Sequence, residues 1–323
     1  MEVIPRVVVK EFKYSVVEKV PYKAGLDSFI HTHPKGEHTH IELYKLVFRG
    51  LVVQEANSSN LLLLEPGTRI KVKCHPWKTY CKWHNGPLDR EDNPLSRVYC
   101  IKPVTRKGLG YCKLHENSTR ALYDRCLSSV GERNISKCIE LDRILCGKVN
   151  FVVYIVDYGG LKAKIGVTRE FRFLHRISEQ PHIVAKIIYK TKSAYEARSI
   201  EILLSRKLSY ILTEKPSTKK LIHQIVDSNL KLAVTRVRSV IENIVKLHTI
   251  NIYKDTPMVR VTLDHTGVLR EITKVYSGRE GIPDETMELI GYWGGFLILN
   301  SRGSVKAIKA STLLHNLSIM VKD

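Results

Sequence analysis

The stretch spanning residues 151–212 decides how we expect this chain to fold. It begins FVVYIVDYGGLKAKIGVTREFRFLHRISEQ at Phe151, and its last helical part reads SAYEARSIEILLSRKL from Ser193. Two runs rich in β-branched residues, 151–157 and 161–167, flank a Tyr-Gly-Gly turn. Such runs joined by a short glycine turn predict a tight β-hairpin.

A helix, a strand and a longer helix are predicted to follow this hairpin. Thr168 can cap a short helix that continues through Ile177, and Pro181 marks its end. The apolar run 183–189 predicts a third strand, and Ser193 is placed to open a longer helix.

The longer helix carries one carboxylate on its apolar side. At about 100° per residue, one arc of the helix collects five apolar side chains: Ala197, Ile200, Leu204, Leu208 and Ile211. Glu201 falls inside the same arc. A carboxylate facing the core is costly unless it is paired or bound to a metal. Two interpretations stay open, a partly buried pair with an arginine such as Arg176 and a metal ligand.

The order of these parts resembles the GIY-YIG nuclease superfamily. Val153-Tyr154-Ile155 stands where the family has Gly-Ile-Tyr, and Lys164-Ile165-Gly166 stands where it has Tyr-Ile-Gly. Arg176 matches the family arginine, and Glu201 matches its metal-binding glutamate. The chain departs from the pattern at Lys164, which replaces a tyrosine, and it has no clear counterpart of the asparagine near the end of the domain.

The resemblance implies metal-assisted hydrolysis of a phosphodiester. Tyr154 would activate water or position the nucleophile, and Arg176 would neutralise the charge that grows on the phosphate. Glu201 would hold Mg²⁺ or Mn²⁺, since hard cations prefer oxygen ligands.

Composition sets the class of protein and of partner. The chain has 323 residues with 43% hydrophobic content, enough for two or three domains with cores of their own. It has no run of about eighteen apolar residues and no signal-peptide core, so we expect a cytoplasmic protein that does not contact a membrane. Its formal charge of +20 favours polyanionic partners, and nucleic acid is the partner we expect, either DNA or RNA, ribosomal RNA included.

All seven cysteines lie in the segment 74–146. Cys81 and His84 form a Cys-x-x-His pair, and Cys112 and His115 repeat it after a connection of 27 residues. Two thiolates and two imidazoles suit the tetrahedral coordination of Zn²⁺, so the sequence predicts a structural zinc site. Three further residues are close enough in sequence to replace one of the four: Cys74, His75 and Cys100.

The other three cysteines, Cys126, Cys138 and Cys146, occur in or beside the predicted helices 118–130 and 135–145. Isolated helical cysteines are mostly small buried hydrophobic residues, and a second metal site is the alternative. The cytoplasmic expectation disfavours disulfides.

The decapeptide HTHPKGEHTH at residues 31–40 contains four histidines. A turn at its centre could set two of them opposite the other two, because alternate residues share a strand face, and such an arrangement could bind a metal: His31, His33, His38 and His40. A solvated polar hairpin is the competing interpretation, and we leave these histidines out of the candidate site.

The zinc segment extends the resemblance. A zinc-ribbon-like module, a Lys-Ile-Gly hairpin domain and the glycine-rich strand pair LIGYWGGFLILNSRG at 289–303 are together similar to an uncharacterised prokaryotic family of unknown function. The similarity covers roughly residues 75–315 and implies no activity.

The whole chain is expected to have an α+β fold built from five consecutive segments. These are a β-rich N-terminal region, a zinc-binding module with helices, a GIY-YIG-like domain, a helical segment and a C-terminal β domain: 1–73, 74–146, 147–215, 216–256 and 257–323. The expected function is nucleic-acid binding, with metal-dependent endonuclease activity in one hypothesis. The other hypothesis is a non-catalytic RNA-binding or ribosome-associated factor that uses the nuclease-like fold as a platform.

Overall fold

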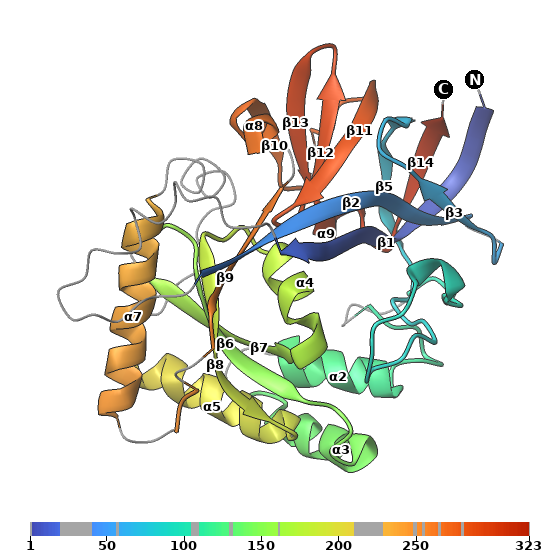
Figure 1. Cartoon of the computed structure of the whole chain (residues 1–323). Helices are drawn as coiled ribbons and strands as arrows, with labels where there is room; N and C mark the ends of the chain where they lie inside the picture. Colours follow the sequence, from blue (N-terminus) through green and yellow to red (C-terminus); the bar gives the residue numbers. More distant parts are fainter. Residues whose placement is uncertain are drawn as a thin grey trace. The chain divides into compact units, whose positions relative to one another are not determined.

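The structure is a computed structural model that describes residues 2–19, 41–55, 58–104, 110–128, 132–160, 162–209, 229–247, 251–253, 256–263, 266–278 and 281–322. The fold is α+β, and the chain divides into two compact units (Figure 1). The first unit contains Met1–Ser15, Val47–Arg125 and Gly267–Asp323, and the second contains Val16–Leu46 and Cys126–Thr266. Four elements contribute residues to both units: β1 (Glu2–Lys19), β2 (Ile41–Glu55), α2 (Thr119–Ser128) and α8 (Thr266–Arg270). The histidine-rich decapeptide lies outside the described residues.

The second unit is built on an antiparallel hairpin. Strand β6 (Phe151–Asp157) pairs with β7 (Ala163–Arg169) on one side and with β8 (Val184–Thr191) on the other. Strand β8 pairs with β9 (Met258–Leu263), and β9 runs parallel to the first half of β2. Every residue of β6 is buried, as expected for a central strand covered on both faces.

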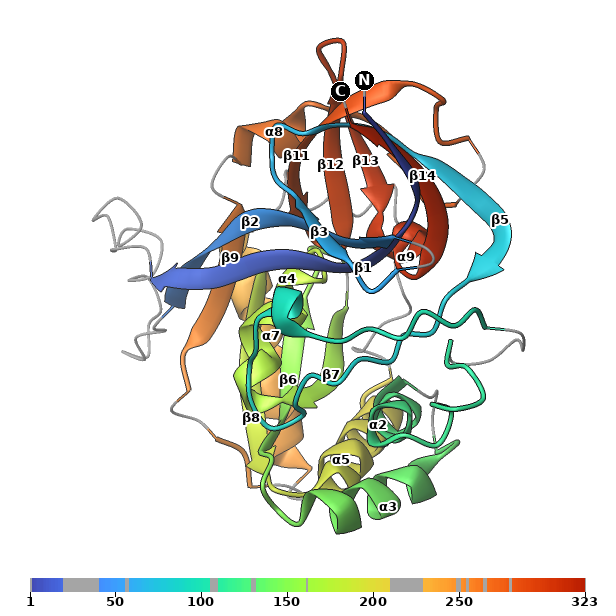
Figure 2. The ribbon, with the colours of Figure 1, turned by 90° about the vertical axis from the view of Figure 1, so that its right-hand side faces the viewer.

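Helices α5 (Ala194–Lys207) and α7 (Leu230–Lys246) both pack against β6, β7 and β8, and they shield these strands from solvent. Helix α3 (Ile135–Leu145) packs along α5, and α4 (Phe173–Ser178) contacts β7 and β9 (Figures 1 and 2). The short 3₁₀ helix η3 (Glu170–Arg172) leads from β7 into α4.

The first unit is mainly β-structure. Strands β11 (Thr286–Trp293), β12 (Phe296–Ser301) and β13 (Ser304–Lys309) form an antiparallel meander, which Figure 2 shows side by side. Strand β10 (Ile272–Tyr276) runs parallel to β13 at one edge, and β4 (Arg69–Lys71) pairs with β11 at the other.

The remaining elements of the first unit complete this β-structure. Strand β14 (Asn316–Lys322) pairs with β1, β4 and β5 (Lys73–Thr79), while β3 (Leu61–Leu64) pairs with the second half of β2. Three short helical segments connect the strands: η2 (Pro94–Ser96), α8 (Thr266–Arg270) and α9 (Ala310–Leu313).

Most predicted elements of the described chain exist, with three differences. Thr168 does not cap a helix, because it pairs with Val152 and β7 continues to Arg169. The segment expected to be the C-terminal β domain also contains the short helix α8, so β10 begins only at Ile272. Strand β9 was expected in the C-terminal β domain, because it begins that segment of the sequence. It instead pairs with β8 and β2 in the second unit.

Candidate functional site

Four potential metal ligands meet in the first unit. The ligand atoms of Cys81, Cys100, Cys112 and His115 all lie within 4.8 Å of one another. The Nδ1 atom of His115 is 3.6 Å from Sγ of Cys81 and 3.4 Å from Sγ of Cys112, and the Sγ atoms of Cys100 and Cys112 are 3.8 Å apart. The three cysteines are buried. This Cys₃His cluster is compatible with a structural metal.

His84, predicted as the fourth ligand, is not a member of the cluster, and Cys100 provides the fourth ligand atom. The Nδ1 atom of His84 instead accepts a hydrogen bond from the N–H of Gly86 at 3.1 Å, and its ring lies 5.3 Å from the ring of Tyr99. The strand bridge between His84 and Tyr99 fixes this arrangement. The side chains of Cys74 and His75 lie outside the described residues.

A sequence signal could have identified Cys100. The dipeptide Tyr-Cys occurs three times, at Tyr80-Cys81, Tyr99-Cys100 and Tyr111-Cys112, and each cysteine is a member of the cluster. The Cys-x-x-His spacing drew attention to only two of these dipeptides.

Backbone and ring contacts hold the ligands in place. The N–H of Cys112 points at Sγ of Cys81 at 3.3 Å, and the N–H of Lys102 points at Sγ of Cys100 at 3.5 Å. The ring of Trp83 stacks on the imidazole of His115 with a centroid separation of 4.1 Å. Amide hydrogen bonds of this kind favour the thiolate, the form that binds a metal.

The three thiols differ in acidity. Burial raises the pKa of the Cys81 thiol to about 12, and burial also raises the pKa of Cys100. Burial acts on Cys112 in the same sense, but hydrogen bonds from Cys81 and from the backbone of His115 outweigh it and lower the pKa of that thiol. A metal that binds here would displace the thiol protons, because the thiolate is the form that ligates a metal.

In the second unit, Tyr154 is the centre of the residues predicted from the nuclease resemblance. It lies on β6 opposite Gly166 of β7, and its side chain is buried. A Cβ atom at position 166 would lie 2.6 Å from the Tyr154 hydroxyl, so the strand pair requires glycine there. The ring of Phe173 meets the Tyr154 ring edge-on at 5.6 Å.

Gln180, which the sequence analysis did not select, connects the polar groups around Tyr154. Its Nε2 donates to the Tyr154 hydroxyl oxygen at 3.1 Å. Its Oε1 accepts from the Tyr158 hydroxyl and from Nζ of Lys164, the latter at 3.5 Å. Gln180 follows α4 by two residues, and no spacing in the sequence distinguishes it from other loop residues.

Glu201 pairs with an arginine of its own helix. Arg176 donates to Glu179 at 3.0 Å, whereas Glu201 forms an ion pair with Arg198, three residues earlier on α5. The helical repeat places those two side chains together on one face of the helix, so the interpretation of Glu201 as the partner of an arginine is confirmed, with Arg198 in the place suggested for Arg176.

Both Arg176 and Glu201 interact electrostatically with Tyr154. Burial raises the pKa of Tyr154, the Arg176 charge opposes this increase, and the Glu201 charge adds to it. Burial likewise raises the pKa of Glu201, against the opposing charges of Arg198, Lys164 and Arg176. The structure thus brings the three predicted residues into one electrostatic environment that also contains two further cations.

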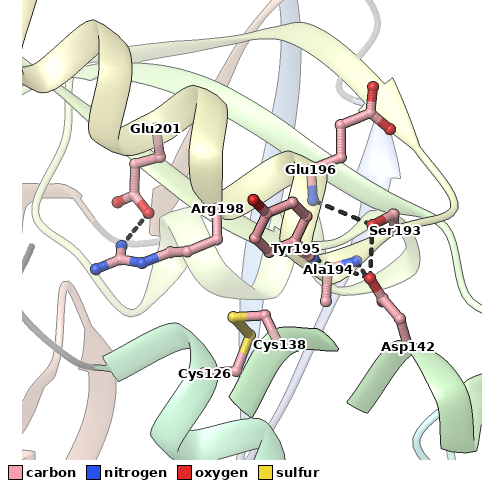
Figure 3. The surroundings of a disulfide bond; sticks show 9 residues. All are labelled: Cys126, Cys138, Asp142, Ser193, Ala194, Tyr195, Glu196, Arg198 and Glu201. Atoms are coloured by element: carbon pink, nitrogen blue, oxygen red, sulfur yellow. Dashed lines mark hydrogen bonds and ion pairs between the residues drawn. A yellow bond between two sulfur atoms is a disulfide. The ribbon is translucent and has the colours of Figure 1, made fainter. Parts of the chain in front are cut away.

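Helix α5, which carries Arg198 and Glu201, is anchored at its N-terminus by α3. The carboxylate of Asp142 accepts hydrogen bonds from the Ser193 hydroxyl at 2.5 Å and from the N–H groups of Ala194 and Tyr195 at 2.6 and 3.1 Å. Ser193 itself caps the helix by accepting from the N–H of Glu196 at 3.1 Å. Figure 3 shows this cap and the Arg198–Glu201 pair on the same helix.

A disulfide bond joins Cys126 and Cys138, although the cytoplasmic expectation disfavoured disulfides (Figure 3). Helices α2 and α3 bring the two Cα atoms to 4.9 Å, within the range that a disulfide spans. Cys146, at the C-terminal end of α3, is an exposed free thiol. The second metal site considered for these three cysteines is therefore not formed.

Comparison with protein-family models, with curated proteins and with solved structures finds no match for this chain. Within the part of the chain that the structure describes, no helix has the length and apolar character needed to cross a membrane.

Proposed function

We propose that this protein binds nucleic acid and that the polar residues around Tyr154 contact the phosphodiester backbone. The observation that carries the proposal is the charge balance at this site. Lys164, Arg176 and Arg198 all act on the carboxylate of Glu201, and Arg172 and Arg176 pair with Glu179, so four cations face two carboxylates at the site. A basic chain with a formal charge of +20 adds a general attraction for polyanions.

The geometry of the site around Tyr154 supports binding of an anionic ligand better than binding of a metal cation. Arginine and lysine bind phosphate oxygens with charge-assisted hydrogen bonds, and the side chain of Arg176 is 44% exposed. Half-buried Gln180 adds a neutral hydrogen-bonding group beside these charges, and the buried Tyr154 and Tyr158 hydroxyls hold it in place. This combination favours the platform hypothesis, in which the nuclease-like unit binds without cleaving.

A second candidate function is phosphodiester hydrolysis. The convergence of Tyr154, Arg176 and Glu201, the residues that the GIY-YIG resemblance implies, favours it. The same residues fit Mg²⁺ or Mn²⁺ poorly, because Glu201 is one carboxylate already paired with Arg198 and exposed to the charges of Lys164 and Arg176. We therefore assign no catalytic step to a divalent cation.

The binding proposal is tested with Arg176→Ala and with Arg206→Ala as the matched control. Arg206 is also in the second unit, and its exposed side chain pairs with an exposed Glu132. We expect Arg176→Ala to weaken binding to labelled DNA or RNA and to reduce the slope of log affinity against log salt by about 1, because one phosphate contact is lost. Arg206→Ala should leave the slope of the wild type nearly unchanged.

Binding of the wild type that does not respond to salt, or equal effects of the two substitutions, would contradict the assignment of the site. Incubation of the wild type with duplex, single-stranded and structured substrates, with Mg²⁺ or with a chelator, separates the two candidate functions. Cleavage that needs Mg²⁺ and disappears in Glu201→Gln would replace the platform proposal with the hydrolase.

For the Cys₃His cluster we propose Zn²⁺ as the metal. Metal–sulfur bonds of about 2.3 Å and metal–nitrogen bonds of about 2.0 Å in a tetrahedron separate two sulfurs by about 3.8 Å and a sulfur from a nitrogen by about 3.5 Å. The separations of 3.8 Å between the Cys100 and Cys112 sulfurs and of 3.4 to 3.6 Å between sulfur and His115 Nδ1 agree with these values. Soft thiolate ligands also favour Zn²⁺ over Mg²⁺ or Ca²⁺.

A further inference from the structure

Lys10 is a buried cation beside the Cys₃His cluster. Only 3% of this residue is exposed, and its Nζ donates a hydrogen bond to the carbonyl oxygen of Cys100 at 2.9 Å. The ammonium also lies 5.8 Å from the ring centroid of Tyr80 and 6.0 Å from that of Tyr99. A lysine is almost never fully buried unless an opposite charge compensates it.

Within the described part of the chain, Lys10 lacks the carboxylate partner that a buried lysine ordinarily has. Among the ion pairs of the described residues, none involves its ammonium. Its neighbour on β1, Glu11, accepts instead from Arg97 and from the Tyr99 hydroxyl, the latter at 3.1 Å. The favourable charge interactions of Lys10 are with the sulfurs of Cys100 and Cys81.

The charge of a loaded centre matches this arrangement. Three thiolates, one neutral imidazole and one divalent cation sum to a net charge of −1. Such a buried anion is costly to hold without a counter-charge, just as the isolated ammonium is. A cation and an anion that are both shielded from water interact more strongly than an exposed pair does.

We infer that Lys10 is the counter-ion of the metal–thiolate centre, so that its charge stabilises the metal-bound form of the cluster. The inference rests on the proposed metal site. Lys10 does not ligate the metal and acts as a positioning residue, because its hydrogen bond also fixes the backbone of Cys100. Its charge has opposite effects on the two forms of the protein, favourable when the three sulfurs are ionised and unfavourable when they are protonated.

The experiment compares the full-length wild type with Lys10→Met, which keeps an unbranched side chain of similar length and removes the charge. Lys13→Met is the matched control, since it removes one lysine charge from the same strand at a half-buried position. Zn²⁺ affinity is measured by competition with a chelator. We expect Lys10→Met to bind about 10- to 100-fold more weakly, the usual effect of losing an outer-shell partner, and Lys13→Met to stay within about threefold of the wild type.

Two further measurements distinguish a charge effect from a loss of packing. The melting temperature of the metal-free protein should be unchanged or higher in Lys10→Met, because an uncompensated buried charge has been removed. Co²⁺ loaded in place of Zn²⁺ should give weaker sulfur-to-metal charge-transfer absorption in Lys10→Met, since thiolate formation is less favoured.

The outcomes separate the two proposals. A wild type that binds no Zn²⁺ would overturn the metal site and the counter-ion together. A wild type that binds Zn²⁺, with Lys10→Met within about threefold of it, would overturn the counter-ion alone. A lower metal-free melting temperature in Lys10→Met, accompanied by no greater loss of affinity than in Lys13→Met, would assign Lys10 a packing role and also overturn it.

Discussion

Tyr154 and Gly166 are matched to each other across the hairpin of the second unit. The tyrosine hydroxyl passes directly over the glycine, where a Cβ atom would approach Cζ of the ring to 2.7 Å. The hydroxyl reaches Gln180 only because this space is free. The Ile-Gly pair that suggested the nuclease resemblance therefore has a steric function in this chain, whether or not Tyr154 takes part in chemistry.

Gly166→Ala should destabilise the second unit by about 1–3 kcal/mol, the usual cost of adding a methyl group to a filled core. Gly160→Ala is the control, since a Cβ atom there has nothing within 4 Å in the turn of the same hairpin. Urea unfolding monitored by circular dichroism measures both variants. Tyr154→Phe removes the atom nearest to the new methyl group, so it should reduce the cost of Gly166→Ala. Equal stabilities of the two alanine variants would contradict this packing.

Helix α5 shows how an element far along the chain can be positioned by another element. Asp142 on α3 accepts three hydrogen bonds at the N-terminal end of α5, and its negative charge interacts favourably with the helix dipole. The disulfide between Cys126 and Cys138 restrains α3, one helical turn before Asp142. The Arg198–Glu201 pair thus lies on a helix whose N-terminal end is held by Asp142 of α3.

Asp142→Ala should lower the free energy of unfolding by about 1–3 kcal/mol, because it removes a cap and leaves N–H groups without their acceptor. Glu140→Ala is the matched control on the same helix, since its exposed carboxylate pairs only across the surface with Lys137. Surface pairs of this kind contribute between 0 and about 1 kcal/mol. Chemical denaturation with the disulfide kept intact measures both. A loss in Asp142→Ala no larger than that in Glu140→Ala would show that the cap contributes little.

Across the whole molecule, each unit contains a histidine that is held neutral by burial. In the second unit, Nδ1 of His182 lies 2.9 Å from the carbonyl oxygen of Gln180, and its Nε2 accepts from the N–H of Val261 at 3.1 Å. Burial lowers the pKa of His182 to about 4, and in the first unit burial lowers the pKa of His315 to about 3. Protonation of His182 would convert the acceptor of Val261 into a donor and break a contact between β9 and the segment that leads into β8.

The stability of the protein should therefore fall on mild acidification. The unfolded chain protonates His182 near pH 6.5 and the folded chain only near pH 4, so the unfolded state binds more protons between these values. The stabilisation from His182 is complete above pH 6.5 and is lost as the pH falls towards 4, with a limit of about 3 kcal/mol. Chemical denaturation at several pH values between 7.5 and 5 measures the free energy of unfolding. This free energy should depend less on pH in His182→Gln than in the wild type. An equal dependence on pH in the two proteins would contradict the role given to His182.

The sequence by itself determined the helices and strands that form through interactions between residues close together in the chain. The β6–β7 hairpin follows from two β-branched runs around a glycine turn, and α5 begins at Ser193 because its hydroxyl satisfies the N–H of Glu196. The mixed α+β character and the enclosure of Tyr154 follow from the same runs. These features depend on residues within one turn or one strand of each other, which the order of amino acids already places together.

Only the tertiary structure decided which distant groups meet. Cys100 rather than His84 completes the cluster, Cys126 and Cys138 form a bond, and β9 joins β8. Gln180 became a central residue for the same reason. Each of these outcomes depends on a separation of a few ångströms between atoms that lie many residues apart in the chain. Such separations are set by how the sheets and helices pack, so residue spacing alone could propose candidate partners but could not select among them.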